Sequence, residues 1–89
     1  MNVSHAERKA ARREEQKRQK QLAEVEERIT VLEQQLAELV GEMQTPAMAV
    51  DHTRLGKLVD RHADLQADLD ECMTRWETLQ ELLAAGGES

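Results

Sequence analysis

The sequence contains almost no aromatic residues. Of its 89 residues only Trp76 is aromatic, and there is no Phe and no Tyr. Aromatic side chains fill compact cores, stack on the bases of single-stranded nucleic acids and line most small-molecule pockets. Their scarcity argues against a rounded globular core, a base-stacking platform and an enzyme active site. We therefore expect an elongated, non-catalytic chain.

Cysteine and long apolar runs are also scarce. Cys72 is the single cysteine, so it has no partner within the chain for a disulfide, which fits a reducing compartment. No apolar run approaches the roughly 20 residues needed to cross a bilayer. We expect no transmembrane helix, no signal peptide, no membrane partner and a cytoplasmic location.

The net charge of −6 hides two opposite regions. Residues 1–20 carry seven bases and three acids, and residues 21–89 carry five bases and fifteen acids. The local net charges are therefore +4 and −10. A polyanion is expected to meet the basic arm, residues 1–20, and to be repelled by the acidic remainder.

The apolar residues form two stripes whose spacings alternate between three and four residues. This heptad pattern is typical of helices that pack in a left-handed coiled coil. His62 is the only polar member of either stripe. The predicted coiled-coil core consists of Leu22, Val25, Ile29, Leu32, Leu36, Leu39, Met43, Leu55, Leu58, His62, Leu65, Leu69, Cys72, Trp76 and Leu79.

A proline separates the two stripes. Pro46 forces Thr45 out of the helical region and ends the first helix, and Asp51 is a suitable N-cap for the second. The sequence predicts helix 1 up to about residue 43, a loop at 44–51, helix 2 at about 52–84 and a flexible tail at 85–89. The fold class is all-α, an antiparallel coiled-coil hairpin (21–84) whose first helix extends into the basic arm, and we expect it to be monomeric.

Two registers of the hairpin are possible. The favoured one places Leu22 opposite Leu79, and Trp76 near Val25. A register slipped by one heptad would place Arg18 opposite Trp76 and so bury a charge against apolar surface. We expect the arm to make no core contacts of the kind that Leu32 and Leu69 make in the middle of the rod.

The histidines do not form a metal site in the sequence pattern. His5, His52 and His62 show none of the spacings of zinc ligands, and Cys72 is remote from His62. His62 is interpreted as a polar layer that helps to set the register, and Cys72 as a small core residue. We expect no metal and no cofactor in this chain.

The basic arm is the predicted binding site. It lacks a helix breaker, and its bases fall on two lines of a helix, of which one runs through Lys9, Arg13, Lys17 and Lys20. Such a stripe of like charge is relieved by a phosphate backbone. The candidate nucleic-acid-binding residues are Arg8, Lys9, Arg12, Arg13, Lys17, Arg18 and Lys20.

The arm does not match a basic-zipper transcription factor. It contains no Asn placed to read a base edge, and the heptads are interrupted by Pro46 and resume in a second stripe. We expect binding that does not depend on base sequence.

The end of the second helix resembles a known family. Arg75, Trp76, Glu77 and Leu79 match the ending that characterises the C-terminal domain of ABC-F ATPases, the soluble branch that includes Uup. The basic segment at residues 4–14 is similar to the linker that precedes that domain. The resemblance covers residues 4–84 and implies an antiparallel coiled coil that follows two ATPase cassettes.

What the resemblance implies is a nucleic-acid-binding accessory domain. DNA is the expected partner for Uup-like members, and ribosomal or transfer RNA and ribosome association are expected elsewhere in the branch. The chain has no phosphate-binding loop, so ATP and Mg²⁺ are expected only in cassettes of a longer parent ATPase, with which this domain would associate. The segment 45–51 also lacks the aromatic residue often found at the tip in relatives.

Two alternatives remain open at this stage. The C-terminal coiled-coil arm of a valyl-tRNA synthetase has the same architecture and would bind tRNA. A protein tether without nucleic-acid binding would have the same heptads and an arm that serves only as a linker.

Overall fold

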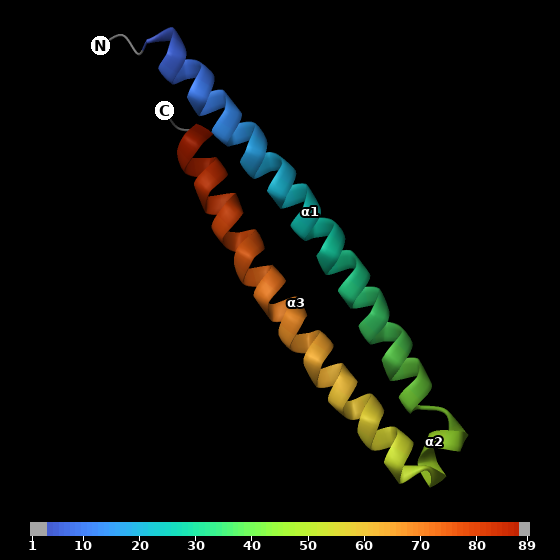
Figure 1. The fold of residues 1–89 in the computed structure, drawn as a ribbon. Coiled ribbons are helices and arrows are strands. Elements are labelled where there is room, and N and C mark those ends of the chain that lie inside the picture. The colour runs from blue at the N-terminus through green and yellow to red at the C-terminus, as the bar shows by residue number, and fades with distance from the viewer. Residues whose placement is uncertain (1–3, 88–89) are drawn as a thin grey trace.

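The computed structural model describes residues 4–87 and forms a thin rod of 71 × 16 × 14 Å. Helix α1 (His5–Met43) runs along the rod, the short helix α2 (Pro46–Val50) turns the chain, and α3 (His52–Gly87) returns beside α1 (Figure 1). The start of α1 and the end of α3 lie at the same end of the rod, and α2 lies at the opposite end. The prediction of an all-α antiparallel hairpin is confirmed.

Capping and proline set the limits of α1. The Ser4 hydroxyl accepts a hydrogen bond from the Glu7 amide at 3.1 Å, which satisfies one of the free donors of the first turn. At the other end Thr45 has an extended backbone (φ −72°, ψ 148°), as expected for a residue before proline. The helix therefore ends at Met43, where the sequence places its end.

The turn is more ordered than a loop, and the prediction of 44–51 as loop is wrong for α2. Pro46 occupies the first position of this helix, where its missing N–H removes no hydrogen bond. The Met48 amide donates to the Thr45 carbonyl at 3.1 Å, and α2 packs against α3. Met48 is only 2% exposed, so it closes the end of the core. The sequence analysis did not identify it as a core residue.

Asp51 caps α3 as predicted. Its Oδ1 accepts a hydrogen bond from the Arg54 amide at 3.1 Å, and its carbonyl oxygen accepts from the Leu55 amide at 2.9 Å. At the other end α3 continues to Gly87, beyond the predicted end at about residue 84. Residues 85–87 are therefore helical and do not belong to a tail, and residues 88–89 lie outside the described residues.

The core is one continuous seam between α1 and α3. Leu32 is completely buried and forms a cluster with Leu36, Leu39 and Leu65, against which Leu58, Leu69 and Cys72 pack. Val25 and Leu79 are also buried toward the other end. The remaining members of the two predicted stripes are half-buried, namely Leu22, Ile29, Met43, Leu55, His62 and Trp76.

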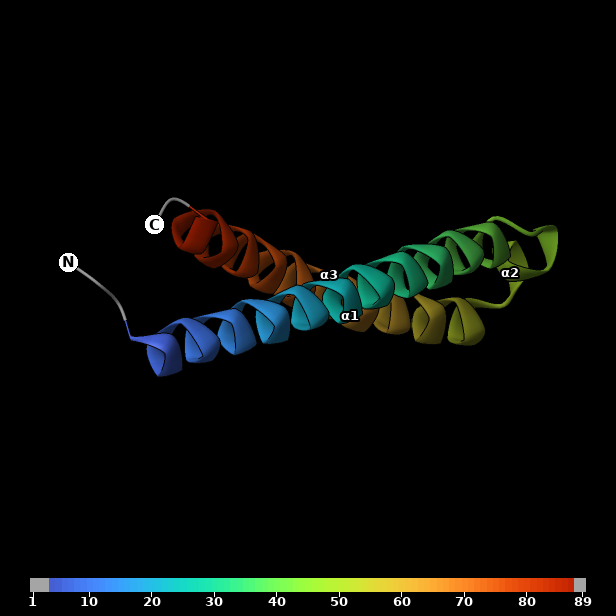
Figure 2. The same ribbon diagram turned by 90° about the horizontal axis from the view of Figure 1, so that it is seen from above.

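The contacts along the seam agree with the favoured register. Arg18 lines one groove together with Leu82 and Leu83, about two turns beyond Trp76, so the slipped register is absent. Near the turn, the Arg54 guanidinium pairs with the Glu42 carboxylate at 3.3 Å across the two helices. Seen from above, the two helices cross near the middle of the rod (Figure 2), as expected for a coiled pair.

Candidate nucleic-acid interface

The basic arm is a rigid continuation of α1. The helix begins at His5 and passes through residues 5–20 without interruption, because this stretch contains no Gly or Pro and has alanines at 6, 10 and 11. Residues 1–3 of the predicted arm lie outside the described residues. In Figure 1 the arm runs beside the end of α3 and then extends past it. The arm and the hairpin therefore have no structural boundary at residue 20.

The inner face of the arm and the end of α3 together line a groove of about 410 Å³. Of the arm's bases only Arg18 is half-buried, and the expectation that the arm makes no core contacts stays a prediction. The lining residues of the groove are Ala11, Arg12, Glu14, Glu15, Arg18, Leu82, Leu83 and Gly86. The heptad positions that precede Leu22 are occupied by Arg18, Glu15 and Ala11. The face of α1 that forms the seam therefore continues into the arm with charged and small residues. Arg18 is half-buried and lines this groove together with Leu82 and Leu83.

The outer face of the arm carries four exposed bases in one row. Lys9, Arg13, Lys17 and Lys20 are separated by four, four and three residues, so they share one face of α1 and follow each other at intervals of about 6 Å or less. None of the four forms an ion pair within residues 4–87. We call this row the outer stripe. The helix holds these positive charges close together.

The structure therefore divides the predicted nucleic-acid-binding residues into two groups. Arg12 and Arg18 line the groove against α3, whereas the four members of the outer stripe point away from that groove. Arg8 is exposed near the start of α1. The outer stripe is thus the continuous row of cations on the arm, and its chemistry suits a polyanion whose negative charges repeat at regular intervals.

The histidines and the cysteine remain apart in the fold. His5 and His52 are exposed at opposite ends of the rod, and His62 is half-buried in the seam. Among residues 4–87 there is no group of three or more His, Cys, Asp or Glu side chains that could hold a metal ion. Cys72 has a free thiol that packs against the leucine cluster.

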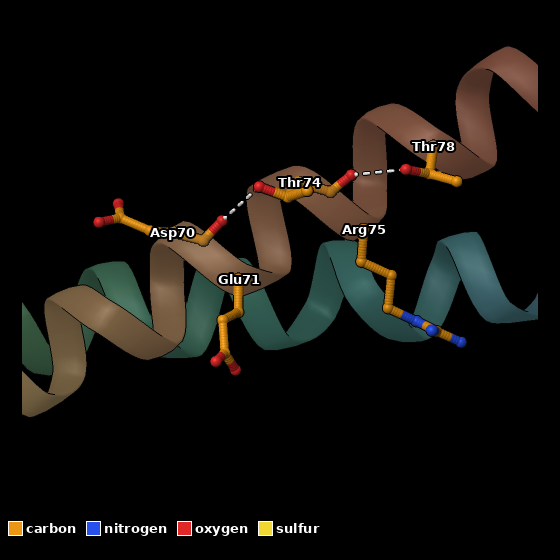
Figure 3. Close-up of a pocket in the computed structure, with 5 residues that line it drawn as sticks. All are labelled: Asp70, Glu71, Thr74, Arg75 and Thr78. Carbon is orange, nitrogen blue, oxygen red and sulfur yellow. Dashed lines mark hydrogen bonds between the residues drawn. The ribbon is translucent and has the colours of Figure 1, made fainter.

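The outer side of α3 has a shallow depression of about 460 Å³ (Figure 3). It is lined by Asp70, Glu71, Thr74, Arg75 and Thr78, all from one helix. The two threonine hydroxyls donate to backbone carbonyls four residues earlier, both at 3.1 Å, and so are already satisfied. The Asp70 carboxylate and the Arg75 guanidinium point away from each other in Figure 3. The depression therefore has no converging polar groups and does not form a ligand site.

The end of α3 lines the groove beside the arm. Leu82, Leu83 and Gly86 contribute to this groove, and Gly86 lies beyond the predicted end of the second helix at about residue 84. Leu83 continues the apolar stripe by four residues beyond Leu79. No part of α1, α2 or α3 is long and apolar enough to cross a membrane.

The arrangement of the hairpin agrees with a comparison against protein families. Residues 13–81 match the family described as ABC transporter C-terminal domain. The match includes the Trp76-Glu77 ending, both heptad stripes and most of the outer stripe. No curated protein and no solved structure matches the chain. A family model that covers this much of the chain decides against a synthetase arm, and the chain belongs to the ABC transporter C-terminal domain family.

Proposed function

We propose that this domain is a cytoplasmic, monomeric accessory domain that binds nucleic acid for an ABC-F ATPase of the Uup type. DNA is the proposed partner, bound without regard to base sequence. The ending Arg75-Trp76-Glu77 followed by Leu79 supports the assignment to this branch of the ABC proteins. ATP and Mg²⁺ would act in the cassettes of the parent protein, which this domain would accompany.

The observation that carries the proposal is the outer stripe. Four exposed bases without ion-pair partners in residues 4–87 lie on one face of a helix whose other face lines the groove beside α3. Phosphate groups that approach the stripe release counterions from the nucleic acid, which favours binding at low salt. The acidic rod repels the same phosphates, so the nucleic acid is directed to the arm.

The side chains of the stripe explain the proposed lack of sequence preference. Lys and Arg contact phosphate oxygens readily, but reading a base requires donors or acceptors fixed against a groove edge. The stripe contains no Asn or Gln. If its four bases each contact one phosphate, the logarithm of the binding constant should fall with the logarithm of salt concentration with a slope of about −3.6.

A charge-reversal experiment tests the proposal. The variant Lys9→Glu/Arg13→Glu/Lys17→Glu is compared with Arg28→Glu/Lys57→Glu/Arg75→Glu, which changes the net charge equally but on the rod. Both are titrated against a labelled DNA duplex at low and moderate salt. We expect the first variant to lose binding and the second to keep most of it, with both remaining helical by circular dichroism.

Two results would contradict the proposal. Equal weakening by both variants would show that net charge alone determines binding. No binding by the unmodified domain at low salt would favour the tether. A parallel titration with tRNA decides the class of nucleic acid, because a clear preference for tRNA would replace DNA as the partner.

A further inference from the structure

A second surface, on the flank of the rod, has the opposite chemistry from the arm. Here the seam between α1 and α3 opens into a groove of about 290 Å³, lined by Glu26, Ile29, Thr30, Glu33, Met73 and Trp76. Ile29 and Trp76 are half-buried members of the seam, and Met73 is 41% exposed. We call this feature the Trp76 groove. Its floor is apolar and accessible from solvent.

Carboxylates lie beside this apolar floor on both helices. Glu26 and Glu33 lie two turns apart on the α1 side of the groove. On α3, Asp70 and Glu77 lie three residues before and four residues after Met73, which places them on the same face of the helix. All four acids are exposed, and none forms an ion pair within residues 4–87.

Basic residues do not pair with these four acids within residues 4–87. The lining of the Trp76 groove contains no base. Arg75, the nearest base along α3, points away from the Asp70 carboxylate (Figure 3). The Asp70 carboxylate accepts one hydrogen bond at 3.0 Å from the Gln66 side chain, which adds no charge. The groove is therefore an apolar slot inside a negative field.

We propose that the Trp76 groove docks a cationic amphipathic helix of a partner protein. One bulky apolar side chain of that helix would insert between Ile29, Met73 and Trp76. Lysine or arginine residues one turn before and after it would meet the carboxylates on the two sides of the groove. Apolar contact supplies affinity in such helix-in-groove complexes, and complementary charge supplies orientation and selectivity.

The chain contains its own reporter for this contact. Trp76 is the only aromatic residue, so its fluorescence emission reports on the groove alone. The probe is a synthetic 18-residue amphipathic helix with leucines along one face and lysines beside them. Two matched peptides replace either the lysines by glutamates or the leucines by alanines. We expect the first peptide to shift the Trp76 emission and to bind at least about tenfold more tightly than either matched peptide.

Variants of the domain locate the contact. Met73→Lys should weaken peptide binding at least about tenfold, because it places a cation at the apolar floor. Glu26→Gln/Glu33→Gln should weaken it by about three- to tenfold and reduce its salt dependence. The control Glu24→Gln/Glu27→Gln makes the same charge change at exposed positions of α1 outside the groove, and it should stay within about twofold. All these positions are exposed, and circular dichroism verifies that each variant is folded.

Several outcomes would overturn the proposal. The glutamate peptide could bind as well as the lysine peptide, or Met73→Lys could leave binding unchanged. Spermine could produce the same Trp76 response at similar concentration, in which case the groove is a site for small polycations. Sedimentation could reveal self-association that Met73→Lys abolishes without any peptide binding, in which case a second copy occupies the groove. Absence of any Trp76 response at millimolar peptide also refutes it.

Discussion

Replacement of Leu32 by alanine is the sharpest test of the seam. Leu32 is completely buried and lies in the cluster with Leu36, Leu39 and Leu65. The change removes three carbon atoms from the core, worth about 0.8 kcal/mol each in transfer free energy, and leaves a partly collapsed cavity. We expect the free energy of unfolding to fall by about 3 kcal/mol. For a domain of this size, that corresponds to a decrease in Tm of about 12–24 °C.

The matched control is the neighbouring residue. Val31 is 39% exposed, and Val31→Ala should change the free energy of unfolding by less than about 0.5 kcal/mol. Urea unfolding followed by circular dichroism measures both values, and its midpoint should not depend on protein concentration if one chain forms the hairpin. If Leu32→Ala is no more destabilising than Val31→Ala, then Leu32 is not at the centre of the seam and the arrangement of the two helices is wrong.

Three further predictions concern the ends of the rod. Met48→Ala should reduce the free energy of unfolding by about 2 kcal/mol, whereas Val50→Ala, at an 82% exposed position in the same short helix, should change it by less than about 0.5 kcal/mol. Asp51→Ala should cost about 1 kcal/mol in urea unfolding and Asp51→Asn much less, because Asn also accepts the capping hydrogen bond. Deletion of residues 1–17 should lower the Tm by only a few degrees in calorimetry, because the side chains of this segment that line the groove beside α3 are charged or small, but it should accelerate amide exchange at residues 82–86. Loss of the whole fold on deletion, or exchange unchanged at 82–86, would contradict this view of the arm.

The heptads were sufficient to predict the two long helices and their antiparallel pairing. Apolar residues at alternating spacings of three and four all lie on one face of a helix. A proline between two such stripes ends the first helix, and the chain can bury both stripes by turning back. The register also followed, because the slipped alternative would bury Arg18 against Trp76. Each of these features is indicated by many residues of the two apolar stripes, so no single position decides the prediction.

The short helix α2 and the groove between the arm and the end of α3 could not be predicted from the heptads. A helix of five residues is too short to show a period, and Pro46 was interpreted only as the end of one helix although it also suits the start of another. The groove that Arg18 shares with Leu82 and Leu83 does not follow from the heptads, because charged residues interrupt the apolar stripe in the arm. The methylene stem of an arginine can line apolar surface while its charged group stays in water.

The uninterrupted α1 helix places two opposite electrostatic surfaces on one element. Lys20, the last base of the outer stripe, is six residues before Glu26, the first acid of the Trp76 groove, which is about 9 Å along the helix. This distance is close to one Debye length at physiological ionic strength. The electrostatic interaction between the two surfaces is therefore weak at physiological salt and strong at low salt. In dilute salt the acidic rod should therefore repel part of any nucleic acid held by the arm. The slope of about −3.6 for the logarithm of the binding constant against the logarithm of salt concentration applies to moderate salt. This plot should become shallower at low salt, because repulsion from the rod grows together with attraction to the outer stripe.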